Sequence, residues 1–148
     1  MNKYKFLKNS NNQNLIFLIF DSECAMCCTF IRWLDLIYKH SKYKLYISSS
    51  LNNLLNKDLS KYIYLDSKDI DYIDSIRKKT IIYISQKDKL LIKSKAIFIL
   101  LQNSGNLLCK LLAKIFSLFP YFILDKIYNL ISKNKIKIST IFNLNKSC

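Results

Sequence analysis

The chain has 148 residues, 51% of them hydrophobic, so it is long enough to bury one core without disulfide staples. It carries 24 Lys and Arg against 10 Asp and Glu, a net charge of +14, and such charge can attract nucleic acids or anionic membranes. The lysines are scattered, with no arginine-rich helix and no aromatic-glycine signature of RNA binding. We therefore expect no nucleic-acid partner.

Targeting signals are weak along the whole sequence. Residues 1–14 are basic and rich in Asn, and the apolar run after them is shorter than the core of a secretory signal. No later stretch reaches the roughly 18 uncharged apolar residues of a spanning helix. We expect a cytoplasmic protein without a membrane span. Residues 1–14 would be a flexible basic leader, 15–137 a single domain and 138–148 a basic tail.

The first predicted elements are a strand and a helix. Residues 15–20 form a short apolar run rich in Ile and Phe, which predicts a buried strand. From Met26 apolar residues recur every three or four positions, which predicts a helix over about 26–39. Residues 43–47 alternate like a second strand, and the short link at 40–42 suits a right-handed βαβ unit.

The second half of the sequence predicts a hairpin and further helices. A short helix is expected near 51–55, and a loop with another short helix over 57–79. Strands at 80–84 and 90–92 would form the hairpin, followed by a helix at 95–101. Gly105, the only glycine, should break the helices at a positive φ, and Pro120 should separate helices at 107–119 and 121–132. This order predicts an α/β, thioredoxin-like fold. It would have a small mixed four-stranded sheet, helices on its faces and extra C-terminal helices.

Cys24 and Cys27 lie where the first strand gives way to the first helix. Free amide groups and the helix dipole favour a thiolate at Cys24, although Glu23 would raise its pKa. Cys27 follows after one helical turn, close enough to attack a mixed disulfide formed by Cys24. We expect Cys24 to be the exposed attacking thiol and Cys27 a sheltered resolving thiol, with Cys28 either a competing resolver or a packed residue.

Asp21 begins the turn before these cysteines. Its carboxylate can accept backbone N–H groups from residues 23 and 24, and it could also exchange a proton with Cys27.

The pattern Asp21-x-x-Cys24-x-x-Cys27 after an apolar strand resembles the DCC-type family of thiol-disulfide oxidoreductases. The likeness covers residues 15–137 and includes Thr80, Ser94-x-Ala96 and the series Pro120, Asp125, Tyr128 and Asn134. The resemblance implies a thioredoxin-like fold and dithiol–disulfide exchange by Asp21, Cys24 and Cys27. The substrate would be a protein or small-molecule thiol or disulfide.

The chain departs from this family at two points. Ser22 stands where the family usually has Gly, and Lys135 stands where it tends to have Arg. Like the pattern of the family, this chain has no proline before the strand at 81–84, where thioredoxin itself uses one to present the substrate backbone. Substrate docking is therefore expected to differ from that of thioredoxin.

Two alternatives stay open at this stage. Zinc sites typically use two close ligand pairs, and here Cys24 and Cys27 form the only such pair. The other candidate ligands, Cys109, Cys148 and His40, are scattered along the sequence. Cys109 is expected in the core, and Cys148 is expected to be free. We therefore expect no metal or other cofactor. The second alternative is a non-catalytic interaction module whose C-terminal helices dock on a partner or a membrane surface.

Overall fold

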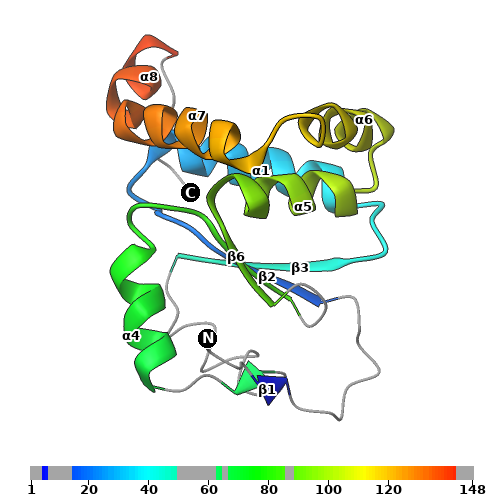
Figure 1. The fold of residues 1–148 in the computed structure, drawn as a ribbon. Coiled ribbons are helices and arrows are strands. Elements are labelled where there is room, and N and C mark those ends of the chain that lie inside the picture. Colours follow the sequence, from blue (N-terminus) through cyan, green and yellow to red (C-terminus); the bar gives the residue numbers. More distant parts are fainter. Residues whose placement is uncertain (1–4, 7–14, 50–62, 65–66, 86–88, 143–148) are drawn as a thin grey trace.

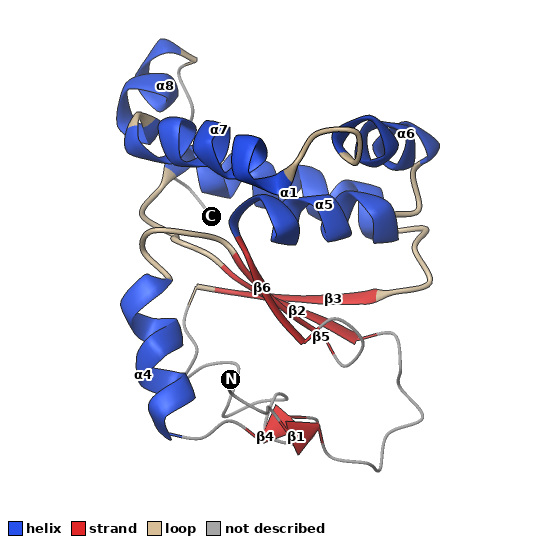
Figure 2. Ribbon diagram, in the orientation of Figure 1, coloured by secondary structure: helices blue, strands red, loops and turns tan. Residues whose placement is uncertain are grey.

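The computed structural model describes residues 5–6, 15–49, 63–64, 67–85 and 89–142. Its main feature is a four-stranded sheet in the order β3 (Lys44–Ser48), β2 (Leu15–Ile19), β5 (Ile82–Ser85) and β6 (Lys89–Ile92) (Figure 2). β2 is parallel to β3 and antiparallel to β5, and β6 is antiparallel to β5. A separate two-stranded sheet pairs β1 (Lys5–Phe6) with β4 (Ile63–Tyr64). The predicted small mixed sheet is confirmed.

The helices lie in layers about this sheet. α1 (Ala25–Tyr38) and α5 (Lys93–Asn103) cover one face, and α4 (Ser67–Ile76) lies on the opposite side (Figure 1). α6 (Leu107–Phe116) and α7 (Tyr121–Lys133) both contact α5 and form an outer layer above it. α8 (Lys135–Ile141) contacts α1 and α7. The predicted α/β, thioredoxin-like arrangement with extra C-terminal helices is confirmed.

The core continues on both faces of β2. Side chains alternate between the two faces of a strand, so Phe17 packs with Ile73 of α4, whereas Leu18 packs with the cluster that holds Leu34 of α1 and Leu100 of α5. All five residues of β2 are buried for this reason. A central strand covered on both sides needs an uninterrupted apolar run, which is what residues 15–20 provide.

Several expectations need adjustment. The helix expected at 51–55 falls outside the described residues. Residues 135–141, in a stretch without clear patterning, form α8. The leader and tail boundaries stay predictions, although Lys5–Phe6 pairs as β1.

Gly105 lies at the break between α5 and α6, as expected, but its φ is not positive. A Cβ at Gly105 would lie 2.7 Å from the backbone carbon of His40 and 2.8 Å from its carbonyl oxygen. The α5–α6 link therefore needs glycine because it passes directly over the end of α1.

Among the described helices, none is long and apolar enough to cross a membrane by itself; α6 and α7 meet those limits only together, across a bend of 112°.

Candidate active site

The turn between β2 and α1 is built on Asp21. Its Oδ1 accepts the amide of Glu23 at 3.1 Å, as expected, whereas the amide of Cys24 donates to the backbone carbonyl of Asp21 at 3.2 Å. Cys24 is the N-cap residue of α1, and its Sγ accepts the backbone N–H of Cys27 at 3.3 Å. The sulfur of Cys24 therefore satisfies one of the free amides at the helix terminus, the position in which negative charge on sulfur is stabilised.

The expected exposure of the two cysteines is reversed. Cys24 is only 6% exposed, because an N-cap side chain turns back over the first helical turn instead of pointing into solvent. Cys27 is half-buried and lines a cavity. The inward stripe of α1 carries Cys28 instead, which is fully buried and disulfide-bonded, so in this state it does not compete with Cys27.

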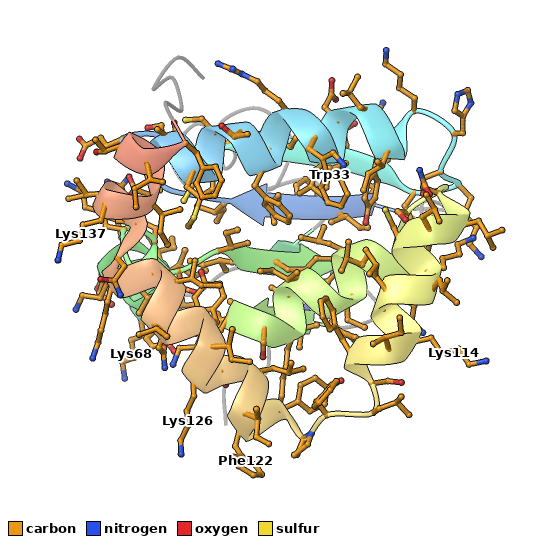
Figure 3. All side chains as sticks on the ribbon, turned by 90° about the horizontal axis from the view of Figure 1, so that it is seen from above. Trp33, Lys68, Lys114, Phe122, Lys126 and Lys137 are labelled. Atoms are coloured by element: carbon orange, nitrogen blue, oxygen red, sulfur yellow. The ribbon has the colours of Figure 1, made fainter. Side chains whose placement is uncertain are left out.

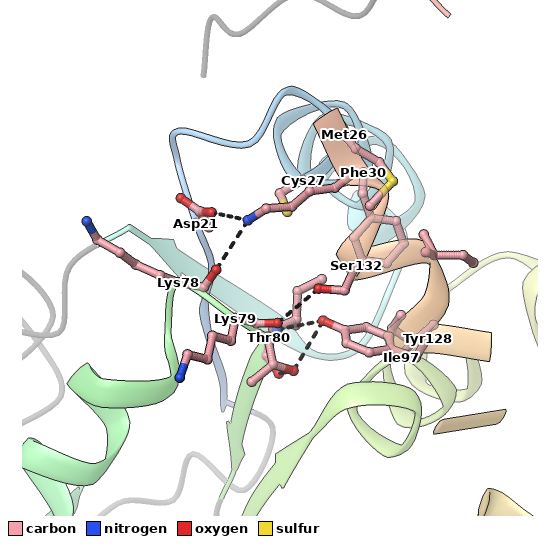
Figure 4. Close-up of a pocket in the computed structure, with 13 residues that line it drawn as sticks. Asp21, Met26, Cys27, Phe30, Lys78, Lys79, Thr80, Ile97, Tyr128 and Ser132 are labelled. Carbon is pink, nitrogen blue, oxygen red and sulfur yellow. Dashed lines mark hydrogen bonds and ion pairs between the residues drawn. The ribbon is translucent and has the colours of Figure 1, made fainter. Parts of the chain in front are cut away.

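A cavity of about 210 Å³ opens beside Cys27 (Figure 4). α1 contributes Cys27, Met26 and Phe30, and the segment before β5 forms the facing wall. α5, α7 and α8 close the remaining sides. The other lining residues are Asp21, Lys78, Lys79, Thr80, Ile81, Ile97, Tyr128, Ile131, Ser132 and Lys135. The interior is mainly apolar, with charged groups supplied by Asp21 and Lys135, whereas the side chains of Lys78 and Lys79 extend away from it (Figure 4).

Lys135, the first residue of α8, reaches the turn before Cys24. Its Nζ lies 2.6 Å from Oδ2 of Asp21 and donates to the carbonyl oxygen of Lys78 at 3.2 Å (Figure 4). The contact joins segments that are 114 positions apart in the chain. The residues alone indicated no role for Lys135. The only signal was that it stands where the resembling family tends to have arginine.

The electrostatics of the site distinguish the two thiols. Burial, its hydrogen bond with Cys24 and the charge of Cys24 raise the pKa of Cys27 far above its ordinary value of 9.0, and Lys135 only partly opposes this. Burial alone would lower the pKa of Lys135, but the hydrogen bond and charge of Asp21 outweigh it and raise that pKa. At neutral pH Cys27 is therefore a protonated thiol and Lys135 a cation.

Side chains of α7 fix the wall opposite Cys27. The hydroxyl of Tyr128 accepts the amide of Ile81 at 3.0 Å and the hydroxyl of Thr80 at 3.2 Å. Asp125 accepts the amide of Ser94 at 3.3 Å and also its hydroxyl. The resemblance to the family included Thr80, Ser94, Asp125 and Tyr128. In the structure these four residues together hold α7 over the sheet.

This network continues on either side. Ser132 donates to the carbonyl oxygen of Lys79 at 3.1 Å. Lys93, which has a left-handed φ of 55° where β6 turns into α5, donates its amide to Thr80 Oγ1 at 3.2 Å. Side chains of α7 and α8 thus form hydrogen bonds with the carbonyl groups of residues 78 and 79 and with the amide of residue 81.

The remaining metal-ligand candidates are not brought to this site. Cys109 is buried with Leu101 and Ala113 in a small cluster under α6, as expected of a core residue. His40 lies beside Gly105. Cys148 falls outside the described residues. Within the described ranges, no three His, Cys, Asp or Glu side chains gather to hold a metal ion.

Comparison with known proteins places this geometry in a family. The model of the DCC1-like thiol-disulfide oxidoreductases matches residues 18–140, which include the whole turn, both cysteines and the α7 network. No curated protein and no solved structure matches the chain. Because the match covers most of the sequence, the chain belongs to the DCC1-like thiol-disulfide oxidoreductase family.

Proposed function

We propose that this protein exchanges a Cys24–Cys27 dithiol with the disulfide of a protein or small-molecule substrate. The observation that carries the proposal is the 3.3 Å hydrogen bond from the amide of Cys27 to Sγ of Cys24 at the start of α1. It places a backbone donor of the helix terminus against the sulfur of Cys24, while the raised pKa of Cys27 keeps the proton on the second sulfur. Cys24 is therefore the attacking thiol, even though it is the more buried of the two.

In the reducing direction, the Cys24 thiolate attacks one substrate sulfur. A Cys24–substrate disulfide forms, and the other substrate sulfur leaves as a thiolate and takes up a proton. Cys27 then loses its proton and attacks Cys24, which expels the second substrate thiolate. The substrate gains two electrons and two protons. The protein ends with a Cys24–Cys27 disulfide, which an external thiol must reduce before another turnover.

Asp21 and Lys135 are positioned to assist the second attack. Both line the cavity with Cys27, and Asp21 is the proposed acceptor of the proton of Cys27. The charge of Lys135 lowers the pKa of Cys27 and so favours its ionisation when the mixed disulfide is resolved. The ion pair holds Asp21 in place, since it ties the turn to α8.

The bonding of the segment before β5 supports a particular mode of substrate entry. The backbone groups of residues 78, 79 and 81 already bond to Lys135, Ser132 and Tyr128. They are not available to pair with an extended substrate strand. We propose that the substrate instead places a small apolar thiol group or a single side chain in the cavity of about 210 Å³ that Cys27 lines, with its disulfide next to the neighbouring Sγ of Cys24.

Insulin-disulfide reduction and trapping of mixed disulfides test the proposal. Cys24→Ser should reduce activity to the uncatalysed background. Cys27→Ser should lose turnover but accumulate a mixed disulfide at Cys24, detectable by intact mass. Cys109→Ser is the matched control, because Cys109 is buried in a different cluster, and it should keep wild-type activity.

Two results would replace the enzyme proposal. Full activity in Cys24→Ser, or no activity in the wild type with any disulfide substrate, would favour a non-catalytic interaction module. About one tightly bound ion per chain in freshly reduced protein would favour a metal-binding protein.

A further inference from the structure

The outer helices α6 and α7 and the turn between them expose large apolar side chains. Their exposed fractions exceed one half at Leu107 (80%), Leu108 (70%), Leu111 (55%), Leu118 (80%), Phe122 (64%) and Leu130 (63%). We name these six residues the outer apolar surface. Single exposed leucines are ordinary, but six large apolar side chains exposed on two consecutive helices and the turn that joins them mark a site of interaction.

The packing of α6 is inverted relative to an ordinary surface helix. Its buried residues are the small Cys109 and Ala113, which let it approach α5 closely, whereas its leucines point outward. Burying the leucines would have stabilised the fold more than burying these small side chains. The sequence of α6 is therefore suited to an apolar environment on its outer side.

Lysines alternate with the apolar residues on both helices. On α6 and the turn after it, Leu107, Lys110, Lys114 and Leu118 follow a spacing of three or four, and all are exposed. On α7, Phe122, Lys126, Leu130 and Lys133 do the same. Lys114, Phe122 and Lys126 project away from the body of the protein (Figure 3). Lysines in such stripes can bury their stems in an apolar layer while their ammonium groups reach anionic headgroups.

The charge of this region is almost purely positive. Residues 105–142 contain six lysines and one acidic residue, Asp125, which is turned inward to Ser94. A second copy of the chain would bring the same lysines against one another, which disfavours self-association through this face. The cores of protein interfaces are depleted in lysine, so an ordinary protein partner fits poorly as well.

We propose that α6 and α7 dock this protein on the surface of an anionic lipid bilayer. The leucines and Phe122 would enter the boundary between headgroups and acyl chains, and Lys110, Lys114 and Lys126 would contact anionic headgroups. Phe119 and Tyr121, exposed at the bend between the helices, are aromatic side chains of the kind enriched at that depth.

Vesicle flotation with the full reduced chain tests this proposal. Vesicles of phosphatidylcholine with about one-third phosphatidylglycerol should bind the protein, and pure phosphatidylcholine vesicles should bind it much less. Each of Lys110→Gln, Lys114→Gln and Lys126→Gln should weaken the partition coefficient about fivefold. The double variant Leu118→Glu with Phe122→Glu should abolish binding. Both side chains are exposed, so circular dichroism should confirm an intact fold.

Matched controls lie on α4, away from this layer. Lys68→Gln and Tyr72→Glu change an exposed lysine and an exposed aromatic residue there and should bind vesicles like the wild type. Cys24→Ser should also bind normally, so a failure here is distinct from a failure of the proposed exchange activity. The proposal is overturned if anionic vesicles do not bind. It is also overturned if the α6–α7 variants bind unchanged, or if the double variant Leu118→Glu with Phe122→Glu only dissolves a dimer of the chain.

Discussion

Replacing Tyr128 with Phe tests whether α7 holds the wall of the site through hydrogen bonds. The change removes one hydroxyl and keeps the ring, so apolar packing is preserved. That hydroxyl is the acceptor for the amide of Ile81, a residue only 6% exposed. Thr80 has a second acceptor, the carbonyl oxygen of Ile81 at 3.3 Å, and can turn to it. The loss therefore falls mainly on one buried backbone N–H.

A buried donor left without a partner costs about 1–3 kcal/mol, so Tyr128→Phe should lower the free energy of unfolding by about that amount. For a chain of this length, each kcal/mol corresponds to about 2–4 °C in Tm. Urea unfolding followed by circular dichroism measures the first quantity, and calorimetry measures the second. The m-value should stay unchanged, because the surface exposed on unfolding is the same.

Tyr121→Phe is the matched control for this experiment. Tyr121 is 42% exposed, and its hydroxyl has no hydrogen bond within the part of the chain that the structure describes. Its ring contacts with Phe98 and Lys95 survive the change. This variant should stay within about 0.5 kcal/mol of the wild type. Equal stabilities for the two variants would refute the inference that Tyr128 anchors α7 to the start of β5.

Two further changes follow from the same structure. Gly105→Ala should lower the free energy of unfolding by about 1–3 kcal/mol in urea, because its Cβ would lie 2.7 Å from the His40 backbone; a neutral effect would show that the link relaxes freely. The free energy of unfolding should also fall as the pH rises above 9. In the unfolded chain the Cys27 thiol ionises near 9.0, whereas in the folded protein burial and Cys24 keep it protonated. Above pH 9 the unfolded state therefore binds fewer protons than the folded state, and higher pH favours unfolding. Cys27 can lower the free energy of unfolding by at most about 1.4 kcal/mol per pH unit. Solvent screening makes the effect smaller, because the group is only half-buried. Cys27→Ala should therefore reduce the pH dependence of the free energy of unfolding between pH 9 and 10. Identical pH profiles for the variant and the wild type would contradict the raised pKa.

Local sequence patterns determined much of this fold. An apolar run, a period of three to four residues and a single proline are properties of neighbouring positions, so β2, α1, the β5–β6 hairpin and the break at Pro120 could be located from them. The same local argument placed Cys24 at the start of α1 and Cys27 one turn later, and the hydrogen bond between them confirms that placement.

Only the tertiary structure decided how the site works around those cysteines. Which sulfur faces the cavity depends on the side-chain orientation of Cys24 at the N-cap and on the helices formed by residues 121–141. The spacing of residues near Cys24 predicts neither of these. Lys135 meets Asp21 from 114 positions away, and Gly105 is required by the backbone of His40 and not by its own φ. Contacts between distant segments depend on how whole elements pack, because the periodicity of one helix records which face is apolar and not what that face will meet.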